Sequence, residues 1–168
     1  MSENLREADE NDVEALTALI NAAYAPAEGF LYDGTRITAA EVREKLEHGR
    51  FILDCDAGGA ACGCVYVTMA GDAGHLGLLA VSPTRQKRGR GRSLARAAES
   101  HCRARGGRTM TLDVVNHRHD LVPFYASLGY AVEGERPFDD ARLNRPGHFV
   151  MMSKALAPEA PARGDDYR

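Results

Sequence analysis

The sequence predicts a single three-layer α+β domain, in which helices cover both faces of a mixed, mostly antiparallel β-sheet. Helical stripes of apolar residues occur before residue 50 and again after residue 90, and apolar runs of strand length occupy most of the rest. The length of 168 residues suits one domain with one substantial core. We expect this domain over residues 1–156 and a disordered tail over residues 157–168, which are rich in proline and charge.

The N-terminal segment is expected to contain a short strand and a long helix. The strand covers residues 4–8. Asn11 or Asp12 then caps a helix that runs to about Tyr24, with apolar residues at helical spacing on one side. Residues 25–37 hold a proline and two glycines between aromatic residues, which predicts a loop lying beside a surface.

A second helix and a hairpin are expected next. Thr38 is followed three residues later by Glu41, and this capping box predicts a helix that ends near Gly49. Residues 50–54 and 61–69 are rich in apolar and β-branched residues and are separated by a glycine-rich turn. They are therefore expected to pair as a β-hairpin.

The remaining elements complete the sheet. Residues 75–81 are nearly all apolar in their second half, as in a buried central strand. A helix over 91–105 is expected to stop at a glycine that favours the left-handed conformation, and a strand over 108–115 follows. A short helix over 122–128 precedes two strands, which are expected over 130–134 and 148–153. The total is about six or seven strands and about four helices.

Charge is unevenly distributed along the chain. The net charge is −3, yet residues 85–108 carry nine basic side chains and one acidic one. Such a cluster in an otherwise acidic chain indicates a bound anion, or else a solvated basic helix face. Charge alone does not separate these two interpretations.

The most informative segment, residues 78–93, leads from a strand through a glycine-containing loop into a helix. Glycines let a ligand approach the backbone, and the first N–H groups of a helix bind phosphate oxygens. A dinucleotide-binding fingerprint would need a third glycine where Leu94 stands, and a P-loop would need Gly-Lys-Ser or Gly-Lys-Thr. Neither pattern is present.

Two motifs in this region resemble those of one family. Residues 86–91, Gln-Lys-Arg-Gly-Arg-Gly, resemble the Q/R-x-x-G-x-G/A acyl-coenzyme A motif of GNAT acetyltransferases. The preceding Leu-Ala-Val-x-Pro, residues 79–83, is similar to the strand before that motif. A second family element is matched by residues 124–130, Phe-Tyr-Ala-Ser-Leu-Gly-Tyr. Both motifs occur in the family's order and together with their strands cover about a third of the chain.

The resemblance implies a GNAT fold, whose sheet is splayed between its fourth and fifth strands. It also implies acetyl-CoA as cosubstrate without a metal, with the pantetheine arm in the gap and the pyrophosphate on the helix N-terminus. The residues expected to contact the coenzyme are Leu79, Ala80, Val81, Gln86, Lys87, Arg88, Gly89, Arg90, Gly91, Arg92, Ser93, Asn116 and Tyr125.

The implied reaction is transfer of an acetyl group from acetyl-CoA to a primary amine by direct attack in a ternary complex. By the match of the second motif, Tyr125 would protonate the departing thiolate, although a packing role is the simpler alternative. The backbone N–H of Val81 or Ala80 would stabilise the oxyanion. For the general base His75 is the expected residue, with His148, Asp113 and Glu28 as rivals.

One departure from the family concerns Asn116. The family commonly has an asparagine about seven residues before its tyrosine, whereas Asn116 lies nine residues before Tyr125. His117, His119 and Pro123 intervene, and proline is tolerated only in the first turn of a helix. Asn116 is therefore retained only as a candidate coenzyme contact.

The acceptor amine is expected to meet four residues of the first predicted loop region and the loop over 136–148. The four are Tyr24, Glu28, Phe30 and Tyr32. The acidic balance outside the basic segment favours a cationic amine by weak steering. A small amine, an amino acid and a protein amino terminus all remain open.

Other classes of protein fit less well. A non-catalytic acyl-CoA sensor with the same fold is the main alternative. A nucleic-acid-binding module is not expected, since no aromatic residues interleave with the arginines. No signal or membrane segment is visible, so the protein is expected to be cytoplasmic, and a homodimer stays open. Cys62 and Cys64 lack a second pair at zinc-site spacing, so no metal site is expected.

Overall fold

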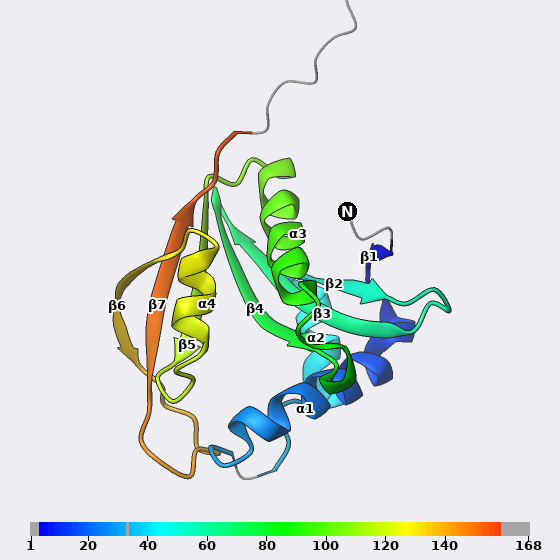
Figure 1. Ribbon diagram of the computed structural model, residues 1–168, viewed down its shortest axis with the longest axis horizontal. Helices are drawn as coiled ribbons and strands as arrows, with labels where there is room; N and C mark the ends of the chain where they lie inside the picture. The colour runs from blue at the N-terminus through cyan, green and yellow to red at the C-terminus, as the bar shows by residue number, and fades with distance from the viewer. Residues whose placement is uncertain (1–3, 33, 159–168) are drawn as a thin grey trace, which may run out of the picture.

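The computed structural model describes residues 4–32 and 34–158, so most of the predicted tail, 159–168, lies outside the described residues. The elements follow the expected order (Figure 1). The helices are α1 (Val13–Glu28), α2 (Ala39–His48), α3 (Arg90–Ala104) and α4 (Leu121–Ser127). The strands are β1 (Leu5–Glu7), β2 (Arg50–Cys55), β3 (Ala61–Ala70), β4 (Ala73–Val81), β5 (Thr109–Val115), β6 (Ala131–Pro137) and β7 (His148–Ala155).

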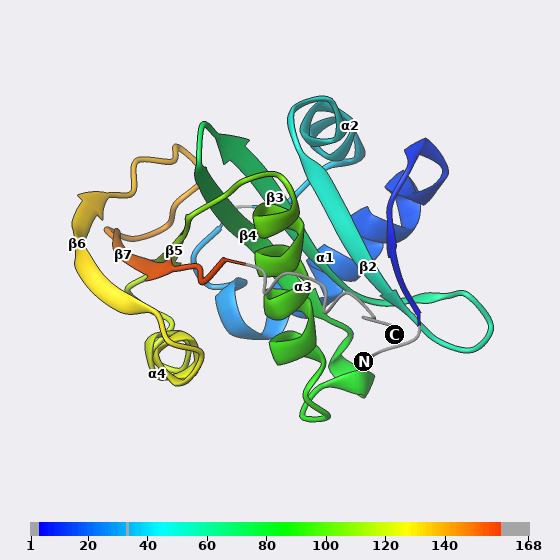
Figure 2. The same cartoon turned by 90° about the horizontal axis from the view of Figure 1, so that it is seen from above.

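The described strands form one seven-stranded sheet in the order β1-β2-β3-β4-β5-β7-β6. All neighbouring strands are antiparallel except β4 and β5, which are parallel. α1 and α2 cover one face, and α3 and α4 cover the other (Figure 2). This is the predicted three-layer α+β arrangement with a mostly antiparallel sheet.

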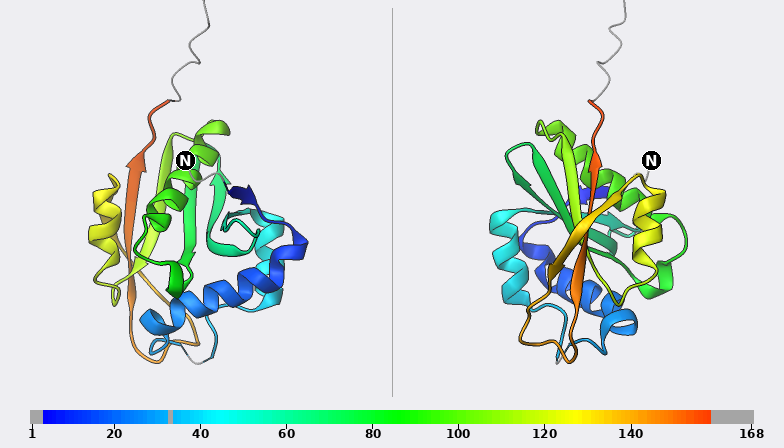
Figure 3. Two further views of the ribbon diagram at one scale, coloured as in Figure 1. Left: turned by 45° about the vertical axis from the view of Figure 1, so that its right-hand side comes forward. Right: turned by 90° about the vertical axis from the view of Figure 1, so that its left-hand side faces the viewer.

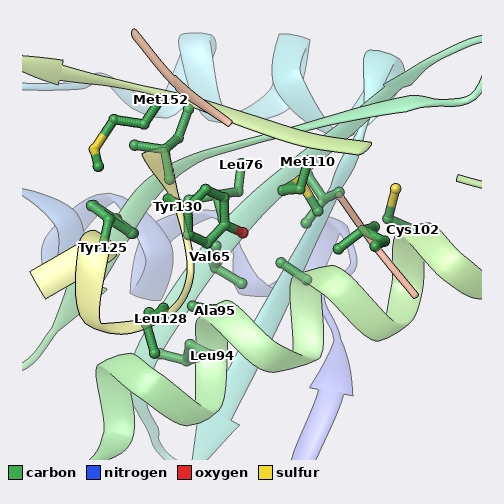
Figure 4. Close-up of a cluster of buried hydrophobic side chains, with 14 of the residues drawn as sticks. Val65, Leu76, Leu94, Ala95, Cys102, Met110, Tyr125, Leu128, Tyr130 and Met152 are labelled. Carbon is green, nitrogen blue, oxygen red and sulfur yellow. The ribbon is translucent and has the colours of Figure 1, made fainter. Parts of the chain in front are cut away.

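Separate apolar clusters fill the two interfaces between helices and sheet. On one face, Leu94 and Ala95 of α3 gather with Tyr125 of α4 over Val65 and Leu76 of the sheet (Figure 4). On the other face, the apolar stripe of α1 packs on β2, β3 and β4. Apolar packing therefore fixes both faces of the sheet, including β4 and β5 at its centre.

β4 and β5 separate soon after they begin, as the prediction of a splayed sheet requires. Their pairing is confined to residues 73–75 of β4 and 109–111 of β5. Beyond this point the strands diverge, and the last turn of α1 lies at the open end of the gap (Figures 1 and 3). The second half of β4 thus has β3 on one side and an unpaired edge on the other.

A β-bulge explains part of this divergence. Cys64 of β3 is opposite Ala80, but Tyr66 is opposite Gly77, so β4 carries one extra residue in this interval. Leu78 within it has a φ of +48°, which non-glycine residues seldom adopt. Because a bulge bends and twists the strand that carries it, β4 turns at the point where its pairing with β5 has already ended.

One local prediction was wrong. α1 continues to Glu28 where a loop was expected from residue 25, and Pro26 lies inside its last turn. At this place proline removes only a bond to the exposed carbonyl of Ala22, which water can satisfy. Asp12 is the N-cap of α1, one of the two expected positions, but its side chain makes no capping bond to that helix. It instead closes a capping box with Asp9 around the 3-10 turn Glu10–Asp12, in which the Asp9 carboxylate accepts from Asn11 and the Asp9 amide donates to Asp12.

The second predicted cap is confirmed, since Thr38 and Glu41 form the expected capping box at the start of α2. In the short helix α4, Pro123 occupies the first turn, where its missing N–H group has no helical role. Within the described ranges, no helix is both long and apolar enough to cross a membrane.

Candidate active site

The loop between β4 and α3 has the backbone form of an anion-binding turn. Lys87 and Gly89 both have positive φ values, +66° and +72°, and Gly89 is the N-cap of α3. The N–H groups of the first turn of α3 have no helical acceptor and lie at the positive end of a fifteen-residue helix. This backbone can therefore hold phosphate oxygens, as the sequence predicts.

The basic side chains of this loop divide into two groups. Arg90 forms an ion pair of 2.6 Å with Asp54 of β2, whose side chain is fully buried, and Arg92 donates to Ser127 at 3.1 Å. Lys87 and Arg88 are exposed. Arg90 and Arg92 thus bind other side chains of the protein, whereas Lys87 and Arg88 are available to bind an anion.

Replacement of Arg90 by methionine is expected to lower the free energy of unfolding by about 2 kcal/mol, because the buried Asp54 carboxylate loses this partner. The matched variant Arg88→Met removes an exposed charge two residues before Arg90 and should stay within about 0.5 kcal/mol of the wild type. Urea unfolding of both variants measures the difference. Equal stabilities would contradict the structural role of Arg90.

The open edge of β4 presents selected backbone groups. Ser82 donates its N–H to Cys62 of β3, and Ala80 is paired with Cys64. Since backbone groups alternate along a strand, those of Ala80 face β3, whereas those of Leu79 and Val81 face the gap. In the structure the Leu79 carbonyl accepts from the Tyr24 hydroxyl at 3.3 Å, and the Val81 carbonyl accepts from the Gln86 amide at 3.1 Å.

A cavity of about 310 Å³ lies in the gap between β4 and β5. α1, the segment before α2, α4 and the facing edges of both strands contribute its walls. It brings together both expected catalytic residues and three of the four expected acceptor residues: Tyr125, His75, Tyr24, Glu28 and Tyr32. Leu79 is the residue of β4 expected to contact the coenzyme that also lines this cavity.

Two predicted site residues lie elsewhere. Phe30 is 44% exposed and packs against His117, with the Arg145 guanidinium over its ring, so it does not line the cavity. The Asn116 side-chain oxygen accepts from the His148 backbone N–H at 2.9 Å. In this arrangement Asn116 fixes the start of β7.

Tyr125 is buried in α4, between the rings of Phe124 and Tyr130. Burial raises its pKa above the ordinary value of a phenol, and the Arg118 charge opposes this only in part. The Tyr125 hydroxyl is therefore protonated at neutral pH. A protonated phenol on a cavity wall can donate a proton to a strong base that forms there.

His75 has the opposite character. Its Nδ1 lies 2.9 Å from the Thr111 hydroxyl, and that hydroxyl donates its single proton to the Gly74 carbonyl. The Thr111 oxygen must then accept from Nδ1–H, which leaves Nε2 as the nitrogen with the lone pair. Burial lowers the His75 pKa, although the Asp113 charge opposes this, so the neutral ring predominates at neutral pH.

The rival bases are held in ion pairs. Glu28 is only 4% exposed and bonds to Arg118 at 3.0 Å; burial raises its pKa, and the guanidinium opposes that shift. Asp113 is paired with Arg136 at 2.5 Å. His148 faces Glu135 and is absent from the cavity walls. Each rival is thus engaged by another charged side chain, whereas His75 has no ion-pair partner among the described residues and lines the cavity, which favours His75.

The sequence did not reveal the cationic side chains of the cavity. Four are present, Arg36, Lys45, Arg118 and Arg136, against the two carboxylates Glu28 and Asp113. They come from four different segments with no shared motif, so only the fold brings them together. The local charge is opposite to the acidic balance from which a cationic acceptor was expected.

No three His, Cys, Asp or Glu side chains in the described ranges cluster in the manner of metal ligands. The four cysteines are buried and carry no disulfide.

Residues 14–130 match the model of the acetyltransferase (GNAT) family. This match covers more than half of the chain and runs from α1 through the β4–α3 loop to the end of the second motif. The protein therefore belongs to the GNAT family, and it is an enzyme of the N-acetyltransferase class. No curated protein sequence matches the chain significantly.

Solved structures agree with this fold. The ribosomal-protein-S18-alanine N-acetyltransferase of Escherichia coli superposes with a TM-score of 0.74 and 17% identity, covering 98% of each chain. A phosphinothricin acetyltransferase of Sinorhizobium meliloti in complex with acetyl-CoA gives 0.74 and 18%, covering 99% of this chain and 98% of its own. An aminoglycoside 6′-N-acetyltransferase complexed with coenzyme A gives 0.73 and 22%, covering 93% and 98%.

Proposed function

We propose that the protein transfers the acetyl group of acetyl-CoA to a primary amine by direct attack in a ternary complex. One observation carries this proposal. The cavity at the splay of the sheet joins an unpaired strand edge, a protonated buried phenol and a neutral imidazole. A relative with the same fold holds acetyl-CoA, which supports the choice of cosubstrate.

The coenzyme would bind along the loop and the open edge. Its pyrophosphate would accept from the first N–H groups of α3, with Lys87 and Arg88 adding charge. Its pantetheine amides would bond to the gap-facing backbone groups of Leu79 and Val81, displacing the Tyr24 and Gln86 side chains from those carbonyls. The Val81 N–H group would then be the oxyanion donor.

The chemistry requires two proton movements. The acceptor arrives as an ammonium ion, and His75 Nε2 takes one proton and passes it to solvent, so the amine nitrogen can attack the thioester carbon. When the tetrahedral intermediate collapses, the C–S bond breaks. The thiolate gains a proton from the Tyr125 hydroxyl, and the second proton of the nitrogen returns to the Tyr125 oxygen, directly or through water, so that the phenol is restored. The products are an acetamide and free coenzyme A, with one proton released.

Acetyl-CoA is expected to raise the Tm by about 5–10 °C when present at about 100 times its Kd, because it binds only the folded state. Differential scanning fluorimetry of the wild type and of Arg88→Met measures this. The variant should need more ligand for the same shift, since it lacks one exposed charge of the loop. No shift at millimolar acetyl-CoA would rule out this cosubstrate.

A non-catalytic sensor is the second candidate, and it would share this binding behaviour. The place of the Tyr125 hydroxyl on the cavity wall favours the enzyme, because a sensor has no use for a proton donor at the thioester. Turnover separates the two.

A further inference from the structure

Arg36 occupies an unusual position beside the cavity. It lies in the segment between α1 and α2, and its guanidinium carbon is 5.2 Å from the centre of the Tyr24 ring and 5.5 Å from that of the Tyr32 ring. It lines the main cavity and also a neighbouring one of about 140 Å³. Its Nε is buried and has no hydrogen-bond partner within the described residues.

The other guanidinium groups of the cavity are neutralised. Arg118 is paired with Glu28 and Asp120, and Arg136 is paired with Asp113. No carboxylate in residues 4–32 and 34–158 lies within ion-pair distance of Arg36, and the same holds for Lys45. These two positive charges on the cavity wall thus have no direct ion-pair partner in that part of the chain, and carboxylates such as Glu28 and Asp140 act on Arg36 only at longer range.

A partly buried guanidinium without a direct hydrogen-bonded anion is costly unless a ligand supplies that anion. Stacking on two aromatic rings holds the guanidinium plane and leaves its N–H edge free to form a paired hydrogen bond with a carboxylate. We propose that Arg36 binds a carboxylate of the acceptor, so that the acceptor is a small amine that also carries a carboxylate. This inference rests on the proposed acetyl transfer and names its substrate class.

The position of Arg36 suits a compact molecule of this kind. The Tyr24 ring lies under the guanidinium, and the hydroxyl of the same ring reaches the Leu79 carbonyl on the open edge of β4. One tyrosine ring therefore separates the carboxylate site from the strand where the thioester would bind. The positive excess on the cavity walls also disfavours polycationic amines such as polyamines.

The test compares the twenty common amino acids with their carboxamides, which keep the amine and lose the negative charge. The wild type, Arg36→Gln, Arg36→Lys and Arg145→Gln are assayed by release of coenzyme A from acetyl-CoA. Arg145 is a matched control. It belongs to the loop over 136–148 that was expected to meet the acceptor, but it does not line the cavity, and it too stacks on an aromatic ring.

The wild type is expected to prefer the acid form of its best substrate over the carboxamide by about 100-fold in kcat/KM. Arg36→Gln should raise KM for that acid by at least about tenfold and abolish the preference, with little change in kcat. Arg36→Lys should retain part of the preference for the acid, and Arg145→Gln should behave as the wild type. Equal use of acids and carboxamides by the wild type, or a preference that survives in Arg36→Gln, would overturn the inference.

Binding measurements keep this result separate from the proposed function. Each variant is first checked for an unchanged Tm and an unchanged shift with acetyl-CoA, which excludes misfolding and a role of Arg36 at the coenzyme phosphates. The coenzyme A complex is then titrated with the same acids and carboxamides. Stabilisation by an acid that Arg36→Gln abolishes supports the carboxylate site even where no transfer occurs, and no acid-specific stabilisation in the wild type contradicts it.

Discussion

Replacement of Tyr125 by phenylalanine is expected to lower kcat by about 100- to 1,000-fold while the affinity for acetyl-CoA changes by less than about twofold. The phenol is buried, and its raised pKa keeps it protonated until a thiolate forms beside it. The variant keeps the ring and its packing against Phe124 and Tyr130 but loses the proton. Steady-state release of coenzyme A, together with a binding titration, measures both quantities.

Tyr130 supplies the matched control for this variant. It lies next to Tyr125, but its hydroxyl donates to the buried Glu99 at 3.0 Å and it does not line the cavity. Tyr130→Phe should therefore lower stability by about 1–2 kcal/mol and leave kcat nearly unchanged. If Tyr125→Phe turns over at the wild-type rate, the phenol has no part in the mechanism.

Replacement of His75 by asparagine is expected to lower kcat/KM by about 100-fold at neutral pH. Asparagine can still donate to Thr111 from the position of Nδ1, but it has no counterpart of the Nε2 lone pair. The acetyl-CoA affinity should be retained. The loss is thus assigned to proton removal and not to the local structure.

The pH profile gives the sharper readout. The active form of His75 is the neutral ring, and burial lowers its pKa below the ordinary value of about 6.5. For the wild type, kcat/KM should be level above that pH and fall as the pH drops through the lowered pKa of His75, approaching tenfold per unit. His75→Asn should lack this limb. A limb that persists unchanged in the variant would transfer the role of base to another group, such as Glu28.

Much of the fold was predictable because local signals dominate it. The capping box of α2 and the apolar runs of β2 to β5 each encode their element within a few residues. The splay between β4 and β5 was implied by family resemblance alone. α1 was predicted too short because Pro26 reads as a breaker. Its effect is small in the last turn of a helix, where the end is fixed by the pair between Glu28 and the distant Arg118.

The candidate site was predictable where a motif carries it and not where the fold assembles it. The loop over 86–91 and Tyr125 stand in contiguous motifs, and His75 begins a recognisable strand. Arg36 and Lys45 reach the cavity from surface-like segments, and no sequence pattern marks them as site residues. The net negative charge of the chain outside residues 85–108 suggested a cationic acceptor. The charge of the cavity depends instead on which side chains the fold brings to its walls, and there the cationic side chains outnumber the carboxylates.

The most direct test of the central claim is acetyl transfer itself. Purified protein is incubated with acetyl-CoA and a panel of amino acids, their carboxamides, polyamines and short peptides, and the products are read by mass spectrometry. We expect one class of amine to gain a single acetyl group with release of an equal amount of coenzyme A, and Tyr125→Phe to slow that gain. Binding of acetyl-CoA with no acetylated amine and no coenzyme A above the uncatalysed rate would contradict the account and indicate a sensor.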